Sequence, residues 1–327
     1  MKTAFVTGTT GQDCSFLTEL LLSKNYQVHG LVRRTSAFNR ERIDHISKDN
    51  FFLYYGDMTD PFSLYSILKK VQPDEVYHLA AQSHVGISFS IPKYTEQVNA
   101  EGTINLLEAI RHADCNPRIY NACTSEVFGG CYPGEKLNEH SDFNPKSPYA
   151  TSKVNAYYSM HNYMDEYGFK IWNGFLFNHE SNRRGENFVT RKITLSLARI
   201  LAGKQRNLEL GNIEAKRDWG YSPEYVLAQY MMLQSNKPDD YVIATGETHS
   251  VREFFEEAFR LVGLESHNYV RINPVFTRPV DVEYLCGDYS KAKTMLEWEP
   301  KTRFKQLVRL MLESDLQKEN VQWKLNV

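Results

Sequence analysis

Short apolar segments alternate with longer amphipathic segments along the first half of this chain, and this alternation limits the possible fold more than any other feature. Continuous apolar runs predict buried strands at 3–8, 27–34, 51–57, 75–81, 118–125 and 170–178. Apolar spacing, or a Pro that opens a helix, predicts helices at 12–24, from about Pro61, over about 95–112 and from about Pro148. Strands separated by helices form βαβ units around a parallel sheet. We therefore expect an α/β fold, a Rossmann-type doubly wound parallel sheet.

The pattern changes after residue 178, where helices become more frequent than strands. Helices are predicted at 188–203, 222–234, 250–262, 289–296 and 303–318, with one more strand in "YVIATG" (241–246). We expect residues 1–178 to form the doubly wound domain, to which 219–247 return. Residues 179–218 and 248–327 are expected to form a smaller, mixed α/β lobe that binds the substrate.

The segment "VTGTTGQDCSFL" (6–17) joins the first predicted strand to the first predicted helix, and it contains Gly8 and Gly11. Glycines let the backbone approach a pyrophosphate, and a helix N-terminus supplies N–H donors and partial positive charge. The expected third glycine is replaced by Cys14, which is small enough for close packing of helix on sheet. This position predicts a dinucleotide-binding turn.

Arg33 and Arg34 stand at the end of the second predicted strand, where a NAD-binding fold carries Asp or Glu for the ribose 2′-hydroxyl. A guanidinium suits a 2′-phosphate, which an acid would repel, so we expect NADP as the cofactor. Asp57, after the third strand, is placed to accept a hydrogen bond from the adenine amino group. The small residues of "HLAAQSHV" (78–85) suit a strand end that lies against the cofactor.

Tyr149 and Lys153 have the spacing Y-x-x-x-K, which places both side chains one turn apart on one face of a helix. We expect the ammonium to lower the pKa of the phenol, so that a phenolate can take a proton from an alcohol. The same spacing occurs at Tyr65/Lys69, Tyr132/Lys136 and Tyr289/Lys293. Only Tyr149 opens a helix soon after a strand that ends in Thr-Ser, so the other pairs are interpreted as chance surface pairs.

That strand end, "ACTSEVFG" (122–129), carries more than a simple alcohol dehydrogenase needs. Thr124 and Ser125 supply hydroxyls that can bind a reacting alcohol, but Glu126 has no obvious role in such a reaction.

The glycine turn, the Thr-Ser strand end and the Y-x-x-x-K pair together resemble the extended short-chain dehydrogenase/reductase family. Longer segments look more specifically like the GDP-mannose 4,6-dehydratases: "VHGLVRRTSAFNRERIDHI" (28–46), "FNHESNRRGENFVTRKI" (177–193), "RDWGYSPEYV" (217–226) and "YVIATGETHSVREF" (241–254). Such motifs run over roughly residues 3–316. Relatives that dehydrate GDP-manno-heptose share many of them, so the sugar stays open between GDP-mannose and GDP-manno-heptose.

The resemblance implies catalytic roles for Thr124, Glu126, Tyr149 and Lys153. Thr124 would hydrogen-bond the 4-hydroxyl of the sugar, and Tyr149 would remove its proton while a hydride passes from C4 to NADP⁺. The 4-ketone acidifies the hydrogen on C5, which Glu126 would take as water leaves from C6. The hydride then returns to C6 and Glu126 returns a proton to C5, which gives a GDP-4-keto-6-deoxy sugar. The role of Ser125 stays open.

The resemblance also implies binding residues. The cofactor candidates are Gly8, Thr10, Gly11, Gln12, Asp13, Arg33, Asp57, Met58, Leu79, Ala80, Ala81, Gln82, Ser83, Tyr94, Lys153, His179 and Arg184. The candidates for the GDP sugar are Ser83, Asn178, Val189, Lys192, Arg217, Arg278 and Asp281. Three positions depart from the family pattern, namely Cys14 for Gly, Asn182 for Pro and Asp281 for Glu, and they could signal a modified substrate.

The polar segment "RRTSAFNRERI" (33–43) is long for a connection between strand and helix. In the resembled family it reaches the cofactor site of a neighbouring subunit, so we expect a homotetramer or a dimer.

Composition excludes several other kinds of protein. A formal net charge of −2 and a pI of about 6.6 argue against nucleic acid or an anionic membrane as a partner. The five cysteines include no C-x-x-C pair, which indicates reduced thiols and no metal site. "MKTAFVTG" enters a strand directly, and no apolar run approaches the roughly 18 residues of a membrane span. We expect a cytoplasmic protein without a signal peptide.

Two alternatives share this fold. One is a GDP-4-keto-sugar reductase or an epimerase. A reductase has no proton to take from C5, so Glu126 beside Thr124 argues against it. A non-catalytic NADP-binding redox sensor would have no reason to keep Thr124, Tyr149 and Lys153 together.

Overall fold

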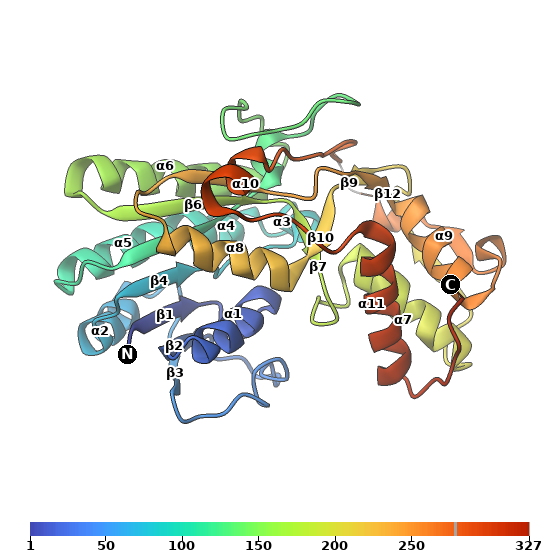
Figure 1. Ribbon diagram of the computed structural model, residues 1–327, viewed down its shortest axis with the longest axis horizontal. Helices are drawn as coiled ribbons and strands as arrows, with labels where there is room; N and C mark the ends of the chain where they lie inside the picture. The colour runs from blue at the N-terminus through green and yellow to red at the C-terminus, as the bar shows by residue number, and fades with distance from the viewer. Residues whose placement is uncertain (278–279, 327) are drawn as a thin grey trace.

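The computed structural model describes residues 1–277 and 280–326, and within this range a seven-stranded sheet dominates (Figure 1). Its order is β11-β6-β5-β4-β1-β2-β3, and every neighbouring pair is parallel. The strands are β1 (Thr3–Thr7), β2 (Gln27–Val32), β3 (Phe51–Tyr55), β4 (Glu75–His78), β5 (Arg118–Thr124), β6 (Lys170–Leu176) and β11 (Asp240–Ile243). The order reverses between β1 and β4, which confirms the predicted Rossmann-type doubly wound sheet.

Helices cover both faces of this sheet. One face packs on α1 (Gln12–Ser23), α8 (Ser222–Gln234) and α10 (Ser290–Leu296), through buried residues such as Leu17, Tyr225 and Leu296. The other face packs on α2 (Pro61–Val71), α5 (Gly102–His112) and α6 (Pro148–Tyr167), through residues such as Leu68 and Met160. Burial on both faces explains why the strands are apolar throughout rather than alternating.

A second group of helices lies beyond one end of the sheet, at the right of Figure 1. The group consists of α7 (Val189–Leu201), α9 (Val251–Val262) and α11 (Phe304–Lys318), which share a core that includes Phe254, Phe259 and Leu312. Two small strand pairs accompany it, β8 (Leu208–Leu210) with β13 (Val270–Ile272) and β9 (Lys216–Arg217) with β12 (His249–Ser250). The division of the chain at 178, 219 and 247 stays a prediction; α10 packs on α8 and β11 although it lies beyond 247.

Two predicted elements have other boundaries in the structure. The strand predicted at 170–178 is confirmed over β6 but ends two residues early. The chain then leaves the large sheet and forms a separate strand, β7 (Asn178–Glu180), with β10 (Trp219–Tyr221). The helix predicted over 95–112 begins earlier, as α4 (Pro92–Glu96), and continues through a π-helical turn (Gln97–Glu101) into α5. A short helix that was not predicted, α3 (Val85–Ser88), follows β4.

In the part of the chain that the structure describes, no helix is both long and apolar enough to cross a membrane.

A buried ion pair joins α7 to α11. The Arg191 guanidinium lies 2.6 Å from Asp315 Oδ1, and the Thr194 hydroxyl donates to Asp315 Oδ2 at 2.7 Å. Burial raises the pKa of Asp315, although the Arg191 charge opposes this shift. Removal of one partner of such a pair leaves a buried charge without compensation.

We therefore predict that Asp315→Ala lowers the free energy of unfolding by about 3–5 kcal/mol, measured by urea denaturation followed by circular dichroism. The matched control is Glu313→Ala on the same helix, which breaks the exposed Arg309–Glu313 pair and should cost at most about 1 kcal/mol. Equal losses in the two variants would contradict the argument.

Candidate active site

A cavity of about 1250 Å³ opens along the carboxyl ends of the parallel strands. Small-molecule pockets usually measure about 300–1,000 Å³, so this cavity has room for more than one nucleotide-sized ligand. It is lined by every predicted catalytic, cofactor and substrate residue named above except Arg278, which lies outside the described residues. In 1–277 and 280–326, no cluster of His, Cys, Asp or Glu could hold a metal ion.

The turn between β1 and α1 forms the floor of one half of this cavity. Gly8 has a φ of +78°, and a Cβ atom there would lie 2.9 Å from the backbone N and Cα of Ala80. Gly11 caps α1 without a side-chain hydrogen bond from the described residues, so N–H groups of the first turn are left for a ligand. Cys14 is buried and its thiol donates to Thr7 O at 3.4 Å, which shows how it fits against the sheet where a glycine was expected.

The ends of β2 and β3 form the outer wall of the same half. The Arg33 guanidinium donates a hydrogen bond to the Tyr94 hydroxyl, so two predicted cofactor residues lie in contact. Asp57 Oδ1 accepts hydrogen bonds from the backbone N and the hydroxyl of Thr59, at 3.0 and 2.9 Å. These bonds fix the position of the Asp57 carboxylate at the cavity wall.

The strand end that contains Thr124 lies at the centre of the cavity. β5 ends at Thr124, and a short 3₁₀ helix (Ser125–Phe128) follows. The Thr124 hydroxyl caps this helix by accepting a hydrogen bond from Glu126 N at 3.3 Å. Glu126 is only 7% exposed, yet none of the described residues gives its carboxylate a hydrogen bond or an ion pair. The unpaired carboxylate lines the cavity, where a ligand can reach it.

Tyr149 and Lys153 face this turn from the start of α6. The helix begins as predicted, with Ser147 as its N-cap and the Ser147 hydroxyl accepting from Ala150 N at 3.1 Å. The Lys153 ammonium donates to Ala122 O at 2.8 Å, which directs it toward the end of β5. Burial lowers the pKa of Lys153.

The expectation that the phenol of Tyr149 has a lowered pKa is wrong for this structure. Burial raises the pKa of Tyr149 to about 12, although the adjacent Thr124 hydroxyl favours the phenolate, and the Glu126 charge raises it further. Desolvation of the phenolate therefore outweighs the stabilising groups around it.

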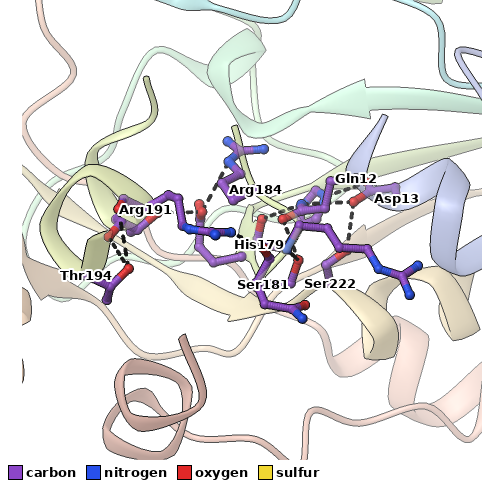
Figure 2. A network of polar contacts seen from close by, with 12 residues as sticks. Gln12, Asp13, His179, Ser181, Arg184, Arg191, Thr194 and Ser222 are labelled. Carbon is purple, nitrogen blue, oxygen red and sulfur yellow. Dashed lines mark hydrogen bonds and ion pairs between the residues drawn. The ribbon is translucent and has the colours of Figure 1, made fainter. Parts of the chain in front are cut away.

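A polar network joins the cofactor turn to β7 (Figure 2). His179 Nε2 lies 2.6 Å from Asp13 Oδ2, and His179 Nδ1 donates to Phe177 O at 2.7 Å. Burial raises the pKa of Asp13, but His179, Ser222 and Gln12 outweigh burial and lower it to about 2. Burial likewise lowers the pKa of His179, but the Asp13 charge outweighs it and leaves the pKa above its usual value. A backbone carbonyl and a carboxylate thus each lie at hydrogen-bond distance from a ring nitrogen, and the Asp13 charge favours the protonated imidazole.

The residues predicted for the substrate line the other half of the cavity. Asn178 Oδ1 is buried without a hydrogen-bond partner among the described residues. Arg217 and Asp281, predicted independently, lie 2.9 Å apart as an ion pair. The Lys192 ammonium lies over the Phe276 ring, 3.3 Å from its centroid. Val189 begins α7 at the same wall.

Two residues at this site were missed by sequence reasoning. Phe276 lines the substrate half of the cavity, at the end of a short 3₁₀ helix (Pro274–Phe276) that the sequence analysis did not predict. Ser222 bonds Asp13 at 2.8 Å. The start of a helix at Ser222-Pro223 could be recognised, but its partner 209 positions away could not.

Comparison with known proteins agrees with this geometry. A model of the family described as "GDP-mannose 4,6 dehydratase" matches residues 5–311. GDP-mannose 4,6 dehydratase 1 of Arabidopsis thaliana is 52% identical, over 97% of this chain and 90% of that protein. The solved UDP-glucose 4-epimerase of Thermus thermophilus, in complex with NAD, has a TM-score of 0.84 at 26% identity, with coverage of 96% and 98%. RMD from Pseudomonas aeruginosa, complexed with NADPH, has a TM-score of 0.81 at 22% identity, with coverage of 97% and 100%.

The doubly wound sheet, with Thr124, Tyr149 and Lys153 at one strand end, defines an enzyme of the short-chain dehydrogenase/reductase class. Within that class, the chain belongs to the GDP-mannose 4,6-dehydratase family.

We predict that Gly8→Ala weakens nucleotide binding by at least about tenfold, because the added Cβ meets the Ala80 backbone at 2.9 Å and a tenfold loss needs only about 1.4 kcal/mol. Calorimetric titration with NADP⁺ measures this. Gly203→Ala is the control. Gly203 has a φ of +71° with nothing within 4 Å of an added Cβ, so this variant introduces backbone strain without a steric contact. Equal nucleotide affinity in the two variants would refute the role of the close approach.

Proposed function

We propose that this enzyme converts GDP-mannose into GDP-4-keto-6-deoxy-mannose and water, with NADP⁺ as a cofactor that ends the cycle unchanged. The observation that carries the proposal is the buried, unpaired carboxylate of Glu126 beside Thr124 and Tyr149. Oxidation of an alcohol alone gives such a carboxylate no task, whereas elimination next to a new ketone requires one.

The residues present fit a nicotinamide dinucleotide. The turn at Gly8, which packs closely on the Ala80 backbone, and the N–H groups in the first turn of α1 suit a pyrophosphate. Arg33, which follows β2 at the cavity wall, suits a 2′-phosphate. The Thermus thermophilus epimerase, which shares the fold, is a complex with NAD. When bound, NADP⁺ would accept a hydride from C4 of the sugar and return it to C6.

The protein side chains would move the protons of this cycle. Thr124 binds the 4-hydroxyl, and Tyr149 takes its proton as C4 is oxidised. Because the pKa of Tyr149 is about 12 here, it can act as a base near neutrality only when a positive charge comes closer to its oxygen. Glu126 then takes the C5 proton and gives it to the hydroxide that leaves C6 as water. After C6 is reduced, Glu126 is reprotonated from solvent and gives this proton to C5, while Tyr149 releases the proton of the 4-hydroxyl to solvent. Ser125, at 2% exposure in the same turn, has no assigned step.

The opposite half of the cavity would hold the GDP group. Lys192 and Arg217 supply positive charge for the diphosphate, and Asn178 offers an unused buried oxygen to a polar group of the ligand. GDP-manno-heptose is the alternative substrate, since its additional carbon lies beyond the reacting C4, C5 and C6. A reductase fits less well because it has no proton to take from C5.

We also propose that the segment 33–43 serves an interface between subunits in a homotetramer or dimer. It contains no helix or strand, and Phe38 on it is 69% exposed. Arg42 fixes the segment to its own cofactor turn, by hydrogen bonds to Arg183 O at 2.6 Å and Thr10 O at 3.3 Å.

Incubation of the purified protein with GDP-mannose, and separately with GDP-manno-heptose, in D₂O without added reductant tests the function. The expected product is a 4-keto-6-deoxy sugar with deuterium at C5 and no net use of NADPH, detected by NMR and mass spectrometry. Stoichiometric consumption of NADPH without loss of water would overturn the proposal. The ratio of kcat/KM for the two sugars decides between them.

We predict that Glu126→Gln lowers kcat for dehydration by about 10²–10⁴-fold, because the amide cannot take the C5 proton. Binding of NADP⁺ should stay unchanged, as measured by calorimetry. The control is Glu135→Gln, which changes an exposed glutamate that does not line the cavity. Normal turnover by Glu126→Gln would show that another group moves the C5 proton.

We predict that Arg33→Ala raises the Kd of NADP⁺ by about 10–150-fold, the value of a lost charged hydrogen bond, and changes the Kd of NAD⁺ by much less. Arg34→Ala is the matched control, because Arg34 bonds the Thr35 carbonyl and does not line the cavity. A similar loss for NADP⁺ and NAD⁺ would contradict recognition of the 2′-phosphate by Arg33.

A further inference from the structure

Asp13 lies in the first turn of α1, but both of its carboxylate oxygens are bonded to protein groups. Oδ2 lies 2.6 Å from His179 Nε2, whereas Oδ1 accepts from the Ser222 hydroxyl at 2.8 Å and from Gln12 Nε2 at 3.1 Å. A negative carboxylate is also poorly suited to contact a pyrophosphate. These bonds assign the Asp13 side chain to the protein side of the cofactor turn.

The partners of Asp13 belong to the small sheet formed by β7 and β10. His179 is the central residue of β7, and Ser222 follows directly after β10. The two strands are parallel, with His179 opposite Gly220. The imidazole also stacks on Tyr225 of α8, with 4.7 Å between ring centroids. One carboxylate therefore fixes both strands of this sheet to the start of α1, as Figure 2 shows for His179 and Ser222.

A second set of bonds repeats this connection. Gln12 Nε2 donates to His179 O at 3.1 Å, and the Ser181 hydroxyl donates to Gln12 Oε1 at 2.8 Å. Neighbouring residues in the first turn of α1 thus hold two positions of the chain at β7, His179 and Ser181.

The same two strands carry groups of the substrate half. Asn178, with its unpartnered buried oxygen, precedes His179 in β7. Glu180 follows it, accepts from the Thr190 hydroxyl at 2.6 Å and pairs with Arg184 at 3.1 Å, which fixes the start of α7 near Lys192. Arg217 lies two positions before β10. A shift of the small sheet would therefore move several substrate-facing groups together.

We propose that Asp13 and His179 are positioning residues that couple the two halves of the cavity, so that occupation of the cofactor turn strengthens binding of the GDP group through β7 and β10. The inference rests on the proposed function, since it takes NADP⁺ and a GDP sugar as the two ligands. Binding of NADP⁺ orders the first turn of α1, and the buried ion pair passes this order to the sheet that carries Asn178. Coupling between two ligands is reciprocal, so GDP must strengthen NADP⁺ binding by the same factor.

Calorimetric titrations with GDP and NADP⁺ as probes test this. The Kd of GDP is measured with and without saturating NADP⁺, and the Kd of NADP⁺ with and without GDP. The wild-type enzyme should show a coupling factor of about 5–150. In Asp13→Asn and in His179→Gln the factor should fall to within about twofold of 1, and the double variant should lose no more than either single variant, since the pair acts as one unit.

Two further variants keep the test decisive. Ser222→Ala removes one hydrogen bond to Asp13 without leaving a buried charge, and it should lower the coupling factor in part, even if the charge variants fold poorly. His161→Gln is the matched control. His161 Nε2 lies 3.5 Å from Asp240 Oδ2, and neither residue lines the cavity. The coupling factor of this variant should equal that of the wild type.

The outcomes separate this inference from the proposed function. A purely structural pair would weaken both ligands and lower the melting temperature, while the coupling factor stayed at its wild-type value; that result overturns the inference. Wild-type enzyme that binds both ligands with a factor of 1 overturns it as well and leaves the proposed function standing. Wild-type enzyme that binds neither ligand overturns both.

Discussion

The parallel direction of all seven strands is the constraint on which the rest of the structure depends. A parallel sheet brings every carboxyl end to one edge, so residues 8, 33, 57, 79 and 124, far apart in sequence, line one cavity. The same constraint requires crossover helices, and the amino terminus of α1 is thereby placed at that edge. A nucleotide site and a reacting group can then meet without any long loop to carry them.

The cavity contains ionisable and polar groups whose interactions within the protein are incomplete. Glu126 is buried without a partner, Asn178 keeps an unused oxygen, and Tyr149 is held as a neutral phenol by burial. In contrast, the carboxylates of Asp13 and Asp315 pair with His179 and Arg191, at 2.6 Å in each case. The difference separates groups that maintain the structure from groups that are left for a ligand, because an unbalanced buried group lowers stability and is retained only where it has a function.

Much of this arrangement was predictable from the sequence. The features that could not be predicted depend on contacts between residues that are distant in the sequence, or on the depth of burial in the assembled fold. Periodicity and helix-start signals located the strands, the turn at Gly8 and the start of α6 at Pro148, since these depend on neighbouring residues. The split at Phe177 was not predicted, because β7 forms only by pairing with β10, about 40 positions later. The partners of Asp13, at 179 and 222, likewise depend on the assembled fold. The pKa of Tyr149 was predicted in the wrong direction because spacing on a helix shows proximity to Lys153 but not the depth of burial.

The pair Arg217–Asp281 shows how a departure from the family pattern changes the physics of the site. The sequence resemblance leads us to expect the longer Glu where Asp281 stands. Here the shorter carboxylate accepts from the Arg217 guanidinium at 2.9 Å, from Asn212 Nδ2 at 3.3 Å and from its neighbour Val282 N at 3.0 Å. A guanidinium that already pairs with a carboxylate attracts a diphosphate less strongly, because the two anions repel one another. If the GDP group binds at Arg217 as proposed, it must either tolerate Asp281 close by or move it onto a ribose hydroxyl, for which a carboxylate is a good acceptor. In the second arrangement Arg217 would pair with the diphosphate, and Asp281 would change partner when the ligand binds.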